Sequence, residues 1–540
     1  MNIFENGILG IDVLSVLIFA PMLSGLIVAM LPGSNKQLAR WVALGLSLLM
    51  GALAIGVFFN YQQNQPPATE SQYLMVVNND WFELLKASWH LGVDGISVAM
   101  ILLTGILVPL AILVSWEIDD RVNIHLGLLL MFEGTLMGVF SAMDLMVFFL
   151  FYELSLVPIY FLIDQWGGKN RKYAATKFMI YSVGGTLGML LATQIIGWTA
   201  GTFDIQQLTQ EWPRFAGTAG NLFGRNVELI KGLSFAGFMI AFGIKVPIWP
   251  FHTWLPDAHG EAPTAGSMLL AGVMLKLGAY GFIRLVVPFF PDVWISEITI
   301  LNLSFTVAGF FAFLAMMGIV LGAFAAFGQN DIKRLVAYSS VNHMGFVAIG
   351  IAVMALAYGR AYMEGSEQHI QDAVFATNGA VMQMFNHGLS SAAMFLLAGA
   401  IYHKTHTRDL REYGGLWVKA PIYGGIFIFT SMASLGLPGL NGFVSEFLVV
   451  RGTLPVFTWL TVISMIGLLF TGAYILKGIR ATLHGPFNMK WRDYNLEIEL
   501  REFIAIAPLM VLMLITGIYP NWILPTISDT VTQIMHGLIG

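Results

Sequence analysis

Residues 238–284 read FMIAFGIKVPIWPFHTWLPDAHGEAPTAGSMLLAGVMLKLGAYGFIR and contain two long apolar runs, each with one lysine inside it. Apolar runs of about 20 residues predict membrane-spanning helices, because the hydrocarbon core of a bilayer is about 30 Å thick. Lys245 lies in the first run and Lys276 in the second. A charged lysine at the centre of such a helix costs about 2.5–3.5 kcal/mol. Both lysines therefore need polar partners within the membrane.

The composition of the whole chain supports the membrane interpretation. Of the 540 residues 57% are hydrophobic and 11% charged, whereas soluble domains are about 25% charged. The apolar runs are continuous and lack the alternation of barrel strands, so we expect an all-α polytopic membrane protein. A net charge of −5 gives no basic field for nucleic acid. The absence of cysteine excludes disulfides and thiolate-bound iron–sulfur clusters from this chain.

The sequence predicts about fourteen spans. Within several residues they are 12–32, 39–60, 90–115, 122–142, 144–164, 175–198, 232–255, 262–288, 297–328, 333–357, 373–402, 421–450, 456–479 and 501–524.

The basic residues between these spans predict the orientation, because lysine and arginine accumulate in cytoplasmic loops. When the connections are numbered along the chain, the odd ones hold 18 Lys and Arg residues and the even ones hold 7. Both termini are therefore expected on the non-cytoplasmic side. Together these are 25 of the 27 basic residues, and the remaining two are Lys245 and Lys276.

Three glutamates, Glu133, Glu153 and Glu446, lie inside the spans. Glu153 has no other charge near it in its own span. An isolated carboxylate there would be protonated, whereas a neighbouring lysine can hold it ionised. We interpret Glu153 and Lys245 as a pair whose interaction changes when the lysine proton moves. The alternative is a purely structural ion pair.

Two histidines add to the buried titratable groups. His343 lies in YSSVNHMGF and His387 in MQMFNHGLSSAAMF, both inside apolar spans. A buried histidine is often only a hydrogen-bonded structural residue. With Lys276 and Glu446, however, these histidines form a chain of titratable groups on four spans, which favours a proton relay. No metal site is predicted, because no HExxH or tight cluster of carboxylates and histidines occurs.

Helix-breaking residues lie beside two of these charges. Pro247 and Pro250 follow Lys245, and Gly436, Pro438, Gly439 and Gly442 precede Glu446. The breaks fall in spans seven and twelve, the spacing expected of two inverted five-helix repeats, spans 4–8 and 9–13. Ordinary proline kinks explain each break but not this spacing.

The repeat interpretation divides the chain into four parts. They are residues 1–121 with the first three spans, residues 122–290 and residues 291–480 as the two five-helix repeats, each a proton half-channel, and residues 481–540 with a loop and the last span.

Long stretches of this sequence resemble the antiporter-like membrane subunits of respiratory complex I. They are FYELSLVPIYFLIDQWGGKNRKYAATKF (151–178), residues 243–284, DIKRLVAYSSVNHMGF (331–346) and HGLSSAAMFLLAGAIYHKTHTRDLREYGGL (387–416). Within that family the resemblance is to the subunit type called M, ND4 or NdhD. Glu446 fits this type, since relatives of the ND2, ND5 and Mrp types typically carry lysine at the matching position.

The resemblance implies a proton channel and a role for each buried charge. Glu153 pairs with Lys245, Lys276 is central, and Glu446 lies on the exit side. His343 and His387 link Lys276 toward Glu446. Lys333 is a candidate uptake residue at the cytoplasmic end, although a loop lysine that reaches the surface explains it equally well. Glu133 is retained as a further buried carboxylate.

The resemblance also implies the setting of the chain. It is expected to bind no cofactor itself, while NADH or ferredoxin, flavin, iron–sulfur clusters and quinone belong to partner subunits. Neighbours of the ND2 (NuoN) and ND5 (NuoL) types and lipids are the expected contacts, in a bacterial plasma membrane or a thylakoid membrane.

Two other functions stay open at this point. A subunit of a Mrp-type Na⁺/H⁺ antiporter shares much of the pattern, and companion subunits distinguish it from complex I. An autonomous solute transporter or a passive scaffold belongs to a different class. A scaffold tolerates the loss of its buried charges, whereas a pump does not.

Overall fold

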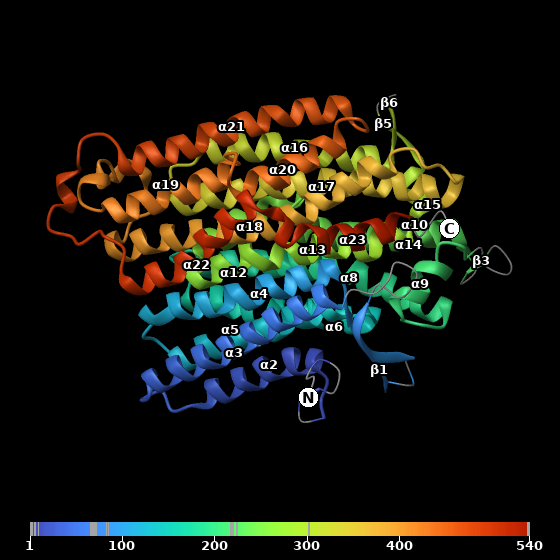
Figure 1. Cartoon of the computed structure of the whole chain (residues 1–540), viewed down its shortest axis with the longest axis horizontal. Coiled ribbons are helices and arrows are strands. Elements are labelled where there is room, and N and C mark those ends of the chain that lie inside the picture. The colour runs from blue at the N-terminus through green and yellow to red at the C-terminus, as the bar shows by residue number, and fades with distance from the viewer. Residues whose placement is uncertain are drawn as a thin grey trace.

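The computed structural model describes residues 10–64, 73–82, 86–215, 225–300 and 303–536, together with residues 4, 7–8, 84 and 221–222. Within these residues, thirteen helical segments are long and apolar enough to cross a membrane. They lie roughly side by side (Figure 1). They are α2 (Val13–Met30), α3 (Lys36–Gln63), α4 (Gly95–Val114), α5 (Val122–Ser141), α6 with α7 (Leu145–Leu154, Leu156–Trp166), α8 (Arg171–Ala200), α10 (Val227–Lys245), α12 to α14 (Thr264–Leu269, Leu275–Gly281, Val287–Phe289), α16 (Val307–Gly328), α17 (Ile332–Glu364), α18 (Ile370–Thr405), α21 (Thr458–Leu483) and α22 (Leu500–Ile518).

The twelfth predicted span, 421–450, is present as two short helices, α19 (Pro421–Leu435) and α20 (Asn441–Thr453). Gly436, with φ of +82°, ends α19 in the left-handed conformation that glycine adopts readily. In span seven, α10 ends at Lys245, and α11 (Trp254–Glu261) follows after a turn. The breaks lie where the prolines and glycines predicted them, and the inverted relation of the two halves stays a prediction.

The eighth span is irregular in a way that the sequence did not indicate. Two π-helical turns, Leu270–Met274 and Phe282–Val286, flank the short helix α13 that carries Lys276. A π-helical turn widens the helix by one residue and is frequent at functional sites.

Two predicted spans begin too early. The span predicted from residue 90 starts with strand β2 (Ala87–Val93), which pairs with β1 (Leu74–Phe82). Helix α4 begins only after Asp94, whose carboxylate accepts hydrogen bonds from the backbone N–H groups of Ile96 and Ser97. The span predicted from residue 297 starts with the hairpin of β5 (Glu297–Ile300) and β6 (Leu303–Thr306), and α16 follows it.

Further short elements lie outside the predicted spans. They are α9 (Ile205–Glu211), α15 (Pro291–Ile295), α23 (Leu524–His536) and the strands β3 (Asn221–Leu222) and β4 (Arg225–Asn226). Helix α23 packs against α4 and α18. The Thr530 hydroxyl accepts the backbone N–H of Gly95, so this last helix is anchored beside the start of α4.

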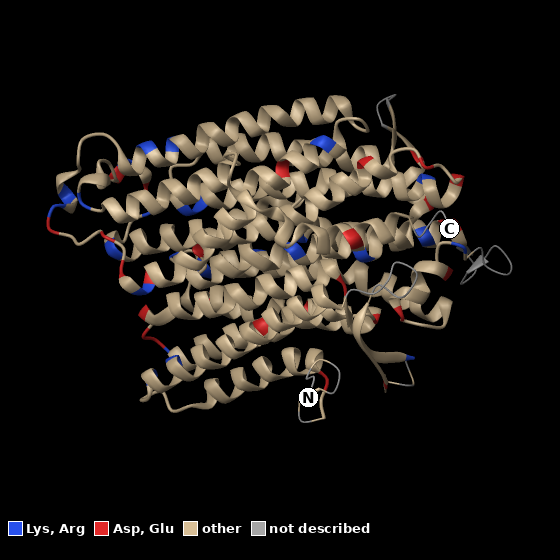
Figure 2. Cartoon of the chain, viewed as in Figure 1, with Lys and Arg blue, Asp and Glu red and all other residues tan. Residues whose placement is uncertain are grey.

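Ion pairs and hydrogen bonds join all seven odd-numbered connections at one end of the helices. Arg408 contacts both Glu261 at 3.2 Å and Asp331 at 3.1 Å. The other joining contacts are Arg40 with Asp119, Glu117 with His403, Gly168 with Glu261 and Lys490 with Glu412. We call this end the basic face. Charged residues gather at the two ends of the molecule (Figure 2).

Candidate functional site

Lys276 is fully buried between the two π-helical turns. Its ammonium group donates to the backbone carbonyl of Ala271 and lies 2.9 Å from Nδ1 of His387 on α18. The widened turn therefore supplies one partner of the charge, and a helix more than a hundred residues away in sequence supplies the other.

Two glycines permit the approach of α18 to this segment. A Cβ atom on Gly388 would lie 2.8 Å from the backbone oxygen of Gly272, too close for an alanine without movement. Small residues at helix crossings let backbones approach in membranes. The neighbouring residue His387 is thereby brought within hydrogen-bond distance of Lys276.

The hydrogen bonds continue from His387 to a third helix. Nε2 of His387 lies 3.1 Å from the hydroxyl of Ser340 on α17. When the Lys276 ammonium donates to Nδ1, the hydrogen of the neutral ring is on Nε2 and can be donated to Ser340. The three side chains thus form a continuous polar path.

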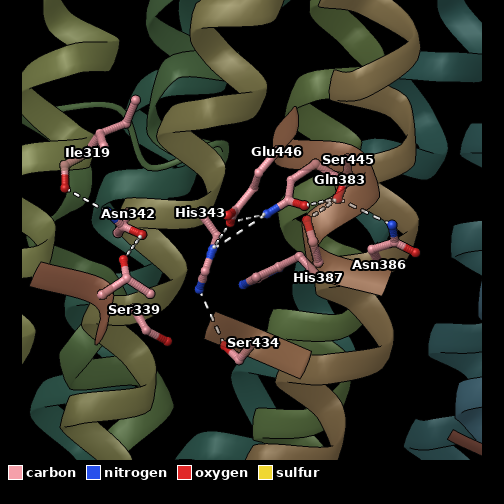
Figure 3. A network of polar contacts seen from close by, with 12 residues as sticks. Ile319, Ser339, Asn342, His343, Gln383, Asn386, His387, Ser434, Ser445 and Glu446 are labelled. Atoms are coloured by element: carbon pink, nitrogen blue, oxygen red, sulfur yellow. Dashed lines mark hydrogen bonds and ion pairs between the residues drawn. The ribbon is translucent and has the colours of Figure 1, made fainter. Parts of the chain in front are cut away.

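His343 and Glu446 form the second centre of the site (Figure 3). Nδ1 of His343 lies 2.9 Å from Oε1 of Glu446, and both side chains are buried. On the other side of the ring, Nε2 lies 3.3 Å from the Ser434 hydroxyl and 3.4 Å from the Tyr474 hydroxyl. The ring is therefore held from both nitrogens. Glu446 itself lies in the middle of α20.

Gln383 completes this second centre and was not identified from the sequence. Its amide nitrogen lies 3.3 Å from Oε1 of Glu446, and its amide oxygen accepts the Ser445 hydroxyl. Gln383 lies one helical turn before His387 on α18. A polar residue at that spacing lies on the same face of the helix, and this spacing was the sequence signal that could have identified Gln383 as part of the site. The histidine rings of the two centres have centroids 5.6 Å apart.

The predicted pair of Glu153 and Lys245 lies within electrostatic range but makes no direct ion pair within 4.0 Å. Lys245 is the last residue of α10, where the helix dipole favours a positive charge. Its ammonium group lies 5.0 Å from the centre of the Tyr152 ring and makes no direct hydrogen bond to a described residue. The aromatic face supplies part of the missing solvation.

Glu133 and Lys333 lie apart from these centres. Glu133 is fully buried on α5, and neither of its carboxyl oxygens has a hydrogen-bond partner among the described residues. The Lys333 ammonium donates to the backbone oxygen of Ala262 at 2.9 Å, below the basic face. Lys333 is 3% exposed, so it is a buried lysine and not one that reaches the surface.

His259 on α11 is a further buried titratable group, outside the set predicted from the sequence. It stacks on Phe395, and the charges of both Lys276 and Lys333 act on it. Its ring nitrogens have no direct partner among the described residues. Across the described part of the chain, no group of three or more His, Asp or Glu side chains could hold a metal ion.

These features define a polytopic helical membrane protein with a buried line of titratable groups, and comparisons with known proteins identify its family. Residues 142–365 and 368–471 match the family described as NADH:quinone oxidoreductase/Mrp antiporter, transmembrane. The chain belongs to this family. The resemblance predicted from the sequence is therefore confirmed.

Individual relatives agree with this assignment. NADH-quinone oxidoreductase subunit M of Pseudomonas aeruginosa is 40% identical over 533 residues, which cover 97% of this chain and 96% of the relative. NAD(P)H-quinone oxidoreductase chain 4 1 of Synechococcus elongatus is 38% identical over 512 residues, which cover 94% of this chain and 88% of the relative.

Solved structures share the fold. A chain of respiratory complex I from Thermus thermophilus with bound NADH has a TM-score of 0.80 and 25% identity, and covers 98% of this chain and 100% of its own. A chain of the Mrp complex from Dietzia has a TM-score of 0.75 at 21% identity, and covers 98% of this chain and 52% of its own. The second likeness concerns the fold alone.

Proposed function

We propose that this chain moves protons across the membrane as an antiporter-like subunit of a complex I type NAD(P)H or ferredoxin:quinone oxidoreductase. The observation that carries the proposal is the buried path in which Lys276 contacts His387, and His343 contacts Glu446. A row of buried titratable groups costs stability in a membrane, so it is expected where protons or ions are moved.

The contacts of the site allow a proton to pass from Lys276 toward Glu446. The Lys276 ammonium can give a proton to Nδ1 of His387, because the two atoms are 2.9 Å apart. His343 can accept a proton at Nε2 and release the one at Nδ1 to Glu446, since a histidine binds protons at either nitrogen. A ring rotation or an intervening water carries the proton between the two histidines. Glu446 then delivers it on the exit side.

Glu153 and Lys245 control the charge within the first predicted five-helix repeat, residues 122–290. Because they act on each other without a direct hydrogen bond, the interaction depends on their separation and on the protonation of the lysine. When Lys245 loses its proton, the carboxylate of Glu153 loses its stabilising charge. A movement of α10 relative to α6 therefore changes the proton affinity of both groups.

The driving energy comes from partner subunits. The sequence contains no cysteine for an iron–sulfur cluster. Flavin, iron–sulfur clusters, quinone and the electron donor, NADH or ferredoxin, belong to other subunits of the complex. Neighbours of the ND2 and ND5 types are expected in the membrane arm, and both chain ends are expected on the non-cytoplasmic side.

The test is to substitute Lys245→Ala or Glu153→Ala in the intact complex. Assembly on native gels is expected to be unchanged, while proton pumping and coupled quinone reduction fall at least about tenfold, as expected when a proton-transfer group is removed. Lys419→Ala is the matched control, because Lys419 is exposed on the basic face. Unchanged pumping in the Lys245 and Glu153 variants contradicts the relay.

The same preparation separates complex I from the Mrp alternative. Purification of the native complex is expected to yield subunits with flavin, iron–sulfur clusters and a quinone site. Small antiporter subunits without redox groups would instead assign the chain to a Mrp-type complex.

A further inference from the structure

The basic face contains a cavity of about 270 Å³ above Lys333. Its wall includes the end of α4, the connection between α7 and α8, the start of α12 and the end of α18. It is thus built from four connections that are far apart in the sequence. Nothing in the relay described above uses this cavity, although it lies on the side from which protons are expected to come.

The rim of the cavity carries a titratable pair. Oε2 of Glu117 lies 3.1 Å from Nδ1 of His403, and the His403 side chain is 51% exposed. Arg501 lies 4.0 Å from Glu117, and the carboxylates of Glu499 and Glu502 also act on Glu117. A carboxylate and an imidazole in contact can share and exchange a proton with water near neutral pH.

Lys333 lies in the wall of the cavity but is almost inaccessible, with 3% of its surface exposed. Its ammonium group donates to the carbonyl of Ala262, and the Ser267 hydroxyl lies 3.3 Å from the same carbonyl. His259 follows on the inner side, where the charges of Lys333 and Lys276 both act on it. Exposure therefore decreases from His403 through Glu117 to Lys333, toward the centre of the site.

We propose that this cavity is where protons enter the Lys276 path, with the Glu117–His403 pair as the group that collects them from water and Lys333 as the group that passes them inward. The inference rests on the proposed pumping function and adds its uptake site. The Lys333 ammonium first releases a proton inward toward His259, and its neutral amine then takes up the proton bound by the pair. Charge is conserved at every step, because one proton arrives as one leaves.

The first test is the substitution Glu117→Gln in the intact complex. Glutamine keeps a hydrogen bond to His403 but cannot carry a proton at this position, so a purely structural contact is preserved. Pumping and coupled quinone reduction are expected to fall about tenfold with normal assembly. Glu412→Gln is the matched control, because Glu412 forms an ion pair with Lys490 on the same face but does not line the cavity. Wild-type rates in Glu117→Gln overturn the proposal.

The second test blocks the cavity without touching its charges. The chain has no cysteine, so Thr264→Cys places a unique thiol of this subunit in the cavity wall. Treatment with benzyl methanethiosulfonate, which adds a bulky uncharged group, is expected to abolish pumping in this variant. The exposed Lys419→Cys and the wild-type complex control for reaction elsewhere. Full pumping after complete labelling of Thr264→Cys overturns the proposal.

The two proposals fail in different ways. If Lys276→Ala stops pumping while Glu117→Gln and the labelled Thr264→Cys variant pump normally, the uptake site is wrong and the relay stands. If Lys276→Ala also pumps normally, the relay itself is wrong.

Discussion

The two broken spans hold their charges in different ways. Lys245 ends α10, where the helix dipole favours its positive charge, and Glu446 lies in the middle of α20. Glu446, however, is hydrogen-bonded to His343 and Gln383, whereas Lys245 lies over an aromatic ring without a direct hydrogen bond to a described residue.

This difference indicates two ways of setting the proton affinity of a buried group. At Glu446 a hydrogen-bonded network fixes the geometry, so the affinity varies little as the protein moves. At Lys245 the main influence is the charge of Glu153 across a gap, and a small displacement changes it strongly in a low dielectric. The first broken span is the adjustable one, and the second is the rigid one.

The largest expected effect on stability is that of Glu446→Ala. It leaves the buried polar groups of His343 and Gln383 without their acceptor, which costs about 2–4 kcal/mol. Glu153→Ala removes fewer contacts and should cost about 1 kcal/mol or less. Thermal unfolding of the purified complex measures both. Equal destabilisation by the two variants would break the comparison, and Glu446→Gln should restore stability but not pumping.

Gly278→Ala is expected to have the next largest effect. A Cβ atom there would lie 2.8 Å from the carbonyl oxygen of Phe242 and 2.9 Å from Cβ of Lys245, so α10 and α13 must separate. Such overpacking typically costs about 1–3 kcal/mol. The shift also displaces Lys245 from Glu153. We therefore expect the pumping rate to fall even under conditions in which the variant complex stays folded. Gly184→Ala is the control, with no atom near its Cβ position, and its rate should be normal.

Gly436→Ala tests the rigid span. Its backbone φ of +82° disfavours alanine, and the added Cβ would lie 2.9 Å from Oε2 of Glu446. We expect a loss of about 1 kcal/mol and weaker contact between Glu446 and His343, seen as slower pumping. Gly425→Ala in the same helix has no such contact. A variant at 436 with normal pumping would show that the network adjusts more easily than proposed.

The smallest expected effect concerns Asp144, which caps α6, the helix that carries Glu153. Burial raises the pKa of Asp144 from 3.8 to about 6, and the charge of Asp204 adds to the shift. The folded state therefore favours the neutral acid, and this stabilisation is present at low pH and lost as the pH rises through about 6. Asp144→Asn removes this dependence. Between pH 5 and pH 7 the wild type should lose about 1 °C more in melting temperature than the variant.

The spans and the buried charges could be predicted because each depends on local sequence. A long apolar run specifies a membrane helix, and a lysine within it is conspicuous whatever its partner. Starts of helices were less predictable. An apolar hairpin next to a span has the same composition as the span, so the strands before α4 and α16 were included in the predicted helices.

The contacts of the site could not be predicted from one sequence. Lys276 and His387 are 111 residues apart, and their contact depends on two π-helical turns and on a crossing between glycines. Ser434 and Tyr474 have no property that distinguishes them from other polar residues in the spans, and Gln383 is marked only by its spacing of one helical turn from His387. Only the packing of their helices shows that they surround His343 and Glu446.

Helix α18 is a single uninterrupted helix that packs against α20 of the broken twelfth span and against the π-helical turn Leu270–Met274. Its 36 residues extend over about 54 Å. It bears Gln383 and His387 at mid-length, and His403 and Lys404 at the basic face. A straight helix keeps its length under load, so a push along its axis displaces all four side chains together. A force applied at the Ile370 end of α18 would thus act on Gln383 and His387 mechanically, without contact to His403 at the other end.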